Sequence, residues 1–183
     1  MLEQARGRLA RFGDQVSFVQ ADLGQPLPIS EPVDAVLSTA TFHWVPDHDA
    51  LFANLASVLR PGGWLVAQCG GFGNIAALLQ VAAEVQPGLH REQNYQTAEA
   101  TRERLERSGF EAIETWLAAA PTPFDTAERL EEYLETVCLR ALVDQLAPEA
   151  RPEFVREVAV RIPDRTIDYV RLNITARRTA SSG

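Results

Sequence analysis

The sequence has few of the residues that hold small secreted domains or structural metal sites together. Only two cysteines occur in 183 residues, Cys69 and Cys138, and neither lies in a C-x-x-C spacing or beside a histidine-rich cluster. This pattern supports neither a disulfide framework nor a structural zinc site. We expect two separately buried thiols and no bound metal.

Long apolar runs and blocks of basic residues are also missing from the sequence. The longest apolar runs, at 34–42 and 63–69, are far too short to cross a bilayer, and Glu3 and Gln4 stand where a signal peptide is apolar. The net charge is -8, and no run of arginines is long enough to follow a phosphate backbone. We therefore predict a cytoplasmic protein that binds neither a membrane nor nucleic acid.

What the chain does contain is an alternation of short apolar strands and amphipathic helices. Its length and its 46% hydrophobic content fit one domain, residues 1–183. Asp47 and Thr97 each stand where they can cap a following helix, and Gly109 can end the second of these helices. The predicted strands are 15–23, 33–40, 63–69, 110–118 and 168–178, and the predicted helices are 2–12, 48–59, 74–85, 97–109, 126–146 and 152–162.

This alternation predicts an α/β fold with a parallel sheet. Residues 33–40 are nearly continuous in small and apolar side chains, which is typical of a strand covered on both faces. Residues 168–178 alternate instead, so we expect a half-exposed strand that ends the sheet. The two helices within 126–162 break the rhythm and are predicted to form a small helical cap inserted in the domain.

Functional groups are expected at one rim of this sheet. In open α/β sheets ligands bind outside the carboxyl ends of the strands, where loops diverge. The first three predicted strands end in residues 21–23, 39–44 and 69–71. A carboxylate followed by main-chain N–H groups, as at Asp22, can accept from an exocyclic amine and donate to a ring nitrogen. This arrangement is suited to adenine.

The order of these segments resembles the class I S-adenosylmethionine-dependent methyltransferases, most closely the trans-aconitate 2-methyltransferase branch. The resemblance is carried by MLEQAR at 1–6, VSFVQADL at 16–23, VDAVLSTATFHWVPD at 33–47 and LASVLRPGGWLVAQ at 55–68. It implies a Rossmann-like sheet with helices on both faces, S-adenosyl-L-methionine as cofactor, and methyl transfer to an oxygen of a small carboxylic acid.

The resemblance also implies roles for single residues. Met1 would pack near the adenine, Asp22 would bind the adenine amine, and the main chain of Leu23 would bind a ring nitrogen. Thr39 and Ala40 would lie beside the methionine portion of the cofactor. For Asp22, a purely structural role as the cap of a turn is the alternative.

The acceptor side of the predicted site contains two aromatic residues and two arginines. His43 and Trp44 would close the floor of the active site, with His43 either facing the substrate or serving as a structural histidine, and Trp44 more a packing than a catalytic residue. Arg140 and Arg161 are candidates for binding the substrate carboxylate, because arginine pairs with carboxylates through two hydrogen bonds.

Two motifs of this family have no counterpart in the sequence. The glycine-rich loop after the first family strand, and the acidic residue after the second, would both precede Met1, while GGFGN at 70–74 follows the wrong strand. We therefore expect an N-terminally truncated domain that lacks the first two strands and binds its cofactor weakly. An inactive binding or regulatory fragment is the alternative. A dehydrogenase half is disfavoured, since it needs a glycine fingerprint too.

Overall fold

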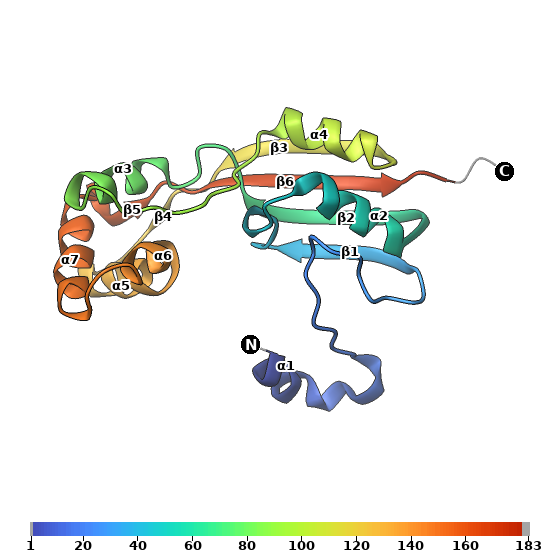
Figure 1. Ribbon diagram of the computed structural model, residues 1–183, viewed down its shortest axis with the longest axis horizontal. Helices are drawn as coiled ribbons and strands as arrows, with labels where there is room; N and C mark the ends of the chain where they lie inside the picture. Colours follow the sequence, from blue (N-terminus) through green and yellow to red (C-terminus); the bar gives the residue numbers. More distant parts are fainter. Residues whose placement is uncertain (1, 181–183) are drawn as a thin grey trace.

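The computed structural model describes residues 2–180, so the role predicted for Met1 lies outside the described residues. Four strands form the main sheet in the order β1 (Val33–Thr39), β2 (Leu59–Gly70), β6 (Val170–Arg178) and β3 (Phe110–Ala119), as Figure 1 shows. Strands β1 and β2 are parallel, whereas β6 is antiparallel to both of its neighbours. The α/β fold is confirmed, with a mixed rather than an all-parallel sheet.

The position of β6 corrects one sequence prediction. Its alternating pattern predicted a strand that ends the sheet, but β6 lies between β2 and β3 and pairs along both edges. Leu172, Ile174 and Ala176 are buried, while Asn173 and Thr175 between them are half-buried. The alternation arises because one face of the strand packs against the core and the other does not, and this says nothing about the strand's edges.

Residues 15–23 form no strand, contrary to the prediction from their β-branched and aromatic content. A strand is stable only beside a hydrogen-bonded neighbour, and no described strand pairs with this segment. The helix before it, α1 (Leu2–Leu9), continues into a 3-10 turn, Ala10–Gln15, and neither contains a buried residue. In Figure 1 α1 lies apart from the sheet.

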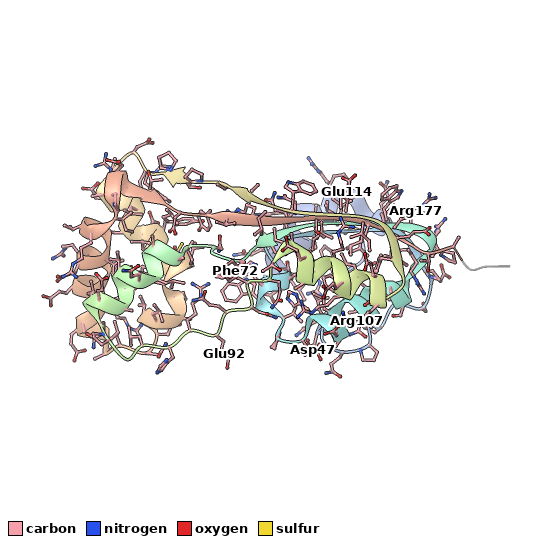
Figure 2. All side chains as sticks on the ribbon, turned by 90° about the horizontal axis from the view of Figure 1, so that it is seen from above. Asp47, Phe72, Glu92, Arg107, Glu114 and Arg177 are labelled. Carbon is pink, nitrogen blue, oxygen red and sulfur yellow. The ribbon has the colours of Figure 1, made fainter. Side chains whose placement is uncertain are left out.

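Two helices cover one face of the sheet. Helix α2 (His48–Val58) begins where Asp47 Oδ1 accepts the N–H of Ala50 at 3.0 Å, and α4 (Ala98–Arg107) begins where Thr97 Oγ1 accepts the N–H of Ala100 at 3.1 Å. Both predicted caps are therefore confirmed. Figure 2 shows α4 lying along the sheet, where it packs on β3 and β6. Leu65, Phe52, Leu105 and other buried apolar side chains form the core between the helices and the sheet.

The opposite face of the sheet carries exposed apolar side chains. Leu37 on β1 is 78% exposed, and Trp64 and Val66 on β2 and Trp116 on β3 are also exposed. Leu37 and Val66 are direct cross-strand partners, so they share this face. Within residues 2–180, strand β1 is covered on one face only, and the cover on both faces that its apolar run predicted is absent.

A second group of helices lies at one end of the sheet (Figure 1). Helix α3 (Ala76–Val85) packs there with α5 (Ala127–Tyr133), α6 (Arg140–Val143) and α7 (Arg151–Arg161) around a separate apolar cluster. Further described elements are the short pair β4 (Thr122–Pro123) and β5 (Thr166–Ile167), and the 3-10 turns η2 (Phe42–Trp44), η4 (Pro148–Ala150) and η5 (Pro163–Arg165). No helix among residues 2–180 is both long and apolar enough to cross a bilayer.

The predicted helix 126–146 is interrupted in the structure. A π-helical turn, Leu134–Cys138, separates α5 from α6, and its wider geometry is shown by the bond from the N–H of Leu139 to the carbonyl of Leu134 at 2.7 Å. After this turn the N–H of Leu142 donates to the carbonyl of Leu139 at 2.8 Å rather than to that of Cys138. The carbonyl of Cys138 is thereby available to a side chain outside the helix.

Candidate functional site

A sharp turn after β1 places two aromatic side chains at the rim of the sheet. Ala40 adopts a positive φ of 53°, and its N–H donates to the carbonyl of Gln68 at 2.7 Å. The 3-10 turn η2 follows. Phe42 is buried and packs edge-on against Phe52, with ring centroids 5.9 Å apart. Because Phe42 is held inside the core, the next side chain, His43, turns toward the rim.

The hydrogen bonds of His43 define the state of its ring. Nδ1 accepts the main-chain N–H of Gly70 at 3.2 Å, so in the neutral ring Nε2 carries the hydrogen. Burial, followed by the positive charges of Arg91 and Arg171, lowers the pKa of His43 to about 4. At neutral pH His43 is therefore an uncharged donor through Nε2 and a weak proton acceptor.

A cavity of about 560 Å³ lies beside His43, between the sheet and the second group of helices. Its lining comes from three regions of the chain: His43, Trp44 and Pro46 after β1, residues 90–94 of the loop between α3 and α4, and Ala141 on α6. The cavity therefore lies where the carboxyl ends of parallel strands open, the position at which α/β folds bind ligands.

Arg91 is the arginine that lines this cavity. Its Nη1 donates to the carbonyl of Cys138, its Nη2 donates to the hydroxyl of Tyr95 at 3.4 Å, and its guanidinium lies 5.2 Å from the ring of Trp44. Its Nε is buried and has no hydrogen-bond partner. Tyr95 in turn packs against His43, with ring centroids 5.7 Å apart. Arg91, Tyr95, Trp44 and His43 thus form one connected group.

The residues predicted to bind adenine lie on an exposed loop. Asp22 Oδ1 accepts the N–H of Gly24 at 2.9 Å, which is the turn-capping role that was its structural alternative. Leu23 packs at the margin of the main core, and its carbonyl accepts from Nδ2 of Asn54 at 3.0 Å. Thr39 and Ala40 are exposed at the end of β1. Cofactor contacts of these residues remain predictions.

The structure brings His43 and Trp44 into one cavity and leaves both predicted arginines outside it. Arg140 pairs with Asp144 at 2.8 Å, and Arg161 pairs with Glu157 at 2.5 Å, each one turn along its own helix. Both arginines are exposed to solvent on the helix surface. Sequence reasoning passed over Arg91 because it stands in a polar loop with no helical or strand periodicity, and only the fold places it beside His43.

The first third of the chain matches a described family. Residues 1–67 match the family described as "Methyltransferase domain". The trans-aconitate 2-methyltransferase of Rhizobium leguminosarum bv. trifolii is 46% identical over 68 residues, covering 37% of this chain and 25% of that protein. That of Acidovorax ebreus is 28% identical over 200 residues, covering 97% of this chain and 74% of the relative.

Solved structures extend the likeness in fold to nearly the whole chain. A putative methyltransferase from Bacillus halodurans has a TM-score of 0.60 at 19% identity, covering 98% of this chain and 79% of that one. Phosphoethanolamine N-methyltransferase 2 of Haemonchus contortus was solved with S-adenosyl-L-methionine. It has a TM-score of 0.57 at 20% identity, covering 99% of this chain and 41% of that one. The chain therefore has the fold of these solved structures, and its residues 1–67 match a methyltransferase domain. It spans about a quarter of the first relatives that it matches.

The buried imidazoles of this chain predict a loss of stability on mild acidification. Burial is the main cause that lowers the pKa of His43 to about 4 and also lowers that of His48. The folded state holds both rings neutral, whereas the unfolded chain takes up protons below about pH 6.5. The free energy of unfolding should therefore fall as the pH drops from about 6.5 toward about 4, and change little above that window.

Urea unfolding measured at about pH 7.5 and about pH 5 checks this expectation. The variant His43→Gln keeps a polar side chain without a titrating ring, so its urea midpoint should fall less between the two pH values. Equal falls for the parent chain and His43→Gln would contradict the neutral state assigned to His43.

Proposed function

We propose that this chain acts as an S-adenosylmethionine-dependent methyltransferase that esterifies a small carboxylic acid. The observation that carries the proposal is the cavity beside the carboxyl ends of β1 and β2, in a chain whose first 67 residues match a methyltransferase domain. The relatives named trans-aconitate 2-methyltransferase supply the class of acceptor. The helices within 126–162 would cover the acid as a cap, and a cytoplasmic location remains a prediction.

The residues at the rim fit the cofactor in chemical terms. Asp22 is exposed and uses Oδ1 for the N–H of Gly24, which leaves Oδ2 to accept an exocyclic amine. The main chain of Leu23 would donate to the adenine ring, and Thr39 and Ala40 would lie beside the methionine portion. When bound, S-adenosylmethionine supplies a methyl group already activated by its sulfonium. The protein then has to align the acceptor and exclude water.

The state of His43 favours a carboxylate over an amine as the acceptor. A carboxyl group with an ordinary pKa of about 4 is already ionised at neutral pH and needs no base. An alkyl amine is protonated at neutral pH and must lose a proton before it can attack. His43, whose pKa is lowered to about 4, is poorly suited to take that proton but can donate a hydrogen bond through Nε2.

Incubation with S-adenosylmethionine at high concentration and a panel of small acids tests this function. We expect a base-labile methyl ester of a dicarboxylic or tricarboxylic acid, detected by mass spectrometry, with no methylation of small primary amines in the same panel. The fully esterified acid serves as the control and should gain no methyl group. Methylated amine without ester would contradict the proposal, and cofactor binding without any product would favour the inactive binding module.

A further inference from the structure

The cavity of this acidic chain is lined by an arginine that forms no ion pair. All 17 basic residues are arginines, and the net charge is -8. Seven arginines form ion pairs with Asp or Glu within residues 2–180, namely Arg60, Arg104, Arg107, Arg129, Arg140, Arg151 and Arg161. Arg91 and Arg171, whose charges both act on His43, are not among them. A permanent charge without a carboxylate partner suits an anionic ligand.

The guanidinium of Arg91 is held in place by uncharged groups alone. Its contacts come from three separate elements: the carbonyl of Cys138 in the π turn, the hydroxyl of Tyr95 in the loop, and the ring of Trp44 in η2. A guanidinium has five N–H donors. The two hydrogen bonds engage one donor on Nη1 and one on Nη2, and the buried Nε is unpaired. The group is thus oriented but incompletely satisfied.

An incompletely satisfied charge in a partly buried place destabilises the protein unless a counter-ion binds there. Glu92 also lines the cavity, but it is exposed and forms no ion pair with Arg91. In Figure 2 Glu92 lies at the outer edge of its loop. The charge of Arg91, the residue before Glu92, is therefore not neutralised by Glu92 and can pair with an anionic ligand.

We propose that Arg91 binds a carboxylate of the acceptor acid, with His43 Nε2–H as a second donor, and so determines the specificity of the site for di- and tricarboxylic acids. This inference rests on the proposed function, because the acid is a methyl acceptor only if the chain transfers methyl groups. The binding of the acid itself does not require the cofactor. Arg91 thus takes the carboxylate-binding role that the sequence predicted for Arg140 and Arg161.

The same contacts explain why lysine cannot replace Arg91. The planar guanidinium directs separate N–H groups to Cys138, to Tyr95 and to a ligand at the same time. A lysine ammonium is a point charge and cannot keep all three contacts in one geometry. We therefore expect Arg91→Lys to keep the charge and still lose affinity.

Titration of the 183-residue chain with trans-aconitate, without cofactor and followed by calorimetry, tests the proposal. The parent chain should bind the acid, Arg91→Met should bind it at least about tenfold more weakly, and Arg91→Lys should fall between the two. Arg129→Met is the matched control: it also removes one positive charge, but Arg129 lies on α5, is exposed and is paired with Asp125. It should bind like the parent chain.

Three results overturn the proposal: equal affinity of Arg91→Met and the parent chain, equal loss in Arg129→Met, or phosphate binding as tightly as trans-aconitate. Far-UV circular dichroism and urea midpoints show whether each variant is folded, and Arg91→Gln replaces Arg91→Met if the latter is not. A separate titration with S-adenosylhomocysteine should give the same affinity for the parent chain and Arg91→Met. Acid binding that depends on Arg91 but is not followed by methyl transfer would contradict the proposed function and would still support this inference.

Discussion

Replacing Phe52 by alanine is expected to lower the free energy of unfolding by about 3–5 kcal/mol. Phe52 is fully buried in α2 and packs edge-on against Phe42, at 5.9 Å, and against His48, at 5.8 Å. Removal of the ring leaves a cavity bordered by the helix and the turn η2, neither of which can close it without giving up other contacts. Urea unfolding followed by far-UV circular dichroism measures the loss.

The chain provides a matched control for this substitution. Phe72, labelled in Figure 2, is 63% exposed after β2, so Phe72→Ala removes the same atoms from the surface and should change stability by no more than about 0.5 kcal/mol. Similar losses for the two variants would show that the core does not lie between α2 and the sheet. Since Phe42 anchors η2, Phe52→Ala should also weaken acid binding at the neighbouring His43.

Replacing Gly70 by alanine is expected to weaken acid binding at least about tenfold while the domain stays folded. A Cβ on Gly70 would lie 2.7 Å from Cε1 of Tyr95 and 2.9 Å from Nδ2 of Asn74. The ring of Tyr95 must move away, and this ring packs on His43 while its hydroxyl accepts from Arg91. The displacement therefore reaches both proposed donors to the acid.

A second glycine of the same segment separates this steric effect from a general loss of stability. Gly73 has a φ of +80° and nothing within 4 Å of an added Cβ, so Gly73→Ala strains the main chain by about 1 kcal/mol without moving Tyr95. We expect its affinity for trans-aconitate to equal that of the parent chain. If Gly70→Ala binds the acid as tightly as Gly73→Ala does, Tyr95 does not support the site.

Local sequence signals were sufficient for a correct prediction where a short stretch of sequence determines its own conformation. Asp47 and Thr97 each accept an N–H three residues ahead, and Gly109 adopts a φ of +79° at the end of the helix. These contacts lie within one turn, so they can be recognised without knowledge of the fold. The predicted strands that became β1, β2, β3 and β6 likewise carry their apolar periodicity in their own residues.

The predictions failed where the outcome depends on a distant neighbour. Residues 15–23 have strand composition but no described strand to pair with, and β6 takes an inner position that its alternating pattern did not indicate. The predicted helix 126–146 breaks at Leu134–Cys138. That break frees a carbonyl for Arg91, which lies 47 residues before Cys138 in the chain.

The sequence by itself determined four of the strands, the helices other than the interrupted 126–146, the caps at Asp47 and Thr97, the resemblance to a methyltransferase and the aromatic pair His43 and Trp44. Only the tertiary structure decided that Arg91 joins this pair while Arg140 and Arg161 do not. The physical reason is that an arginine on a helix can pair with a carboxylate one turn away, which the local sequence spacing predicts. The partners of an arginine in a loop depend instead on how separate elements pack around it.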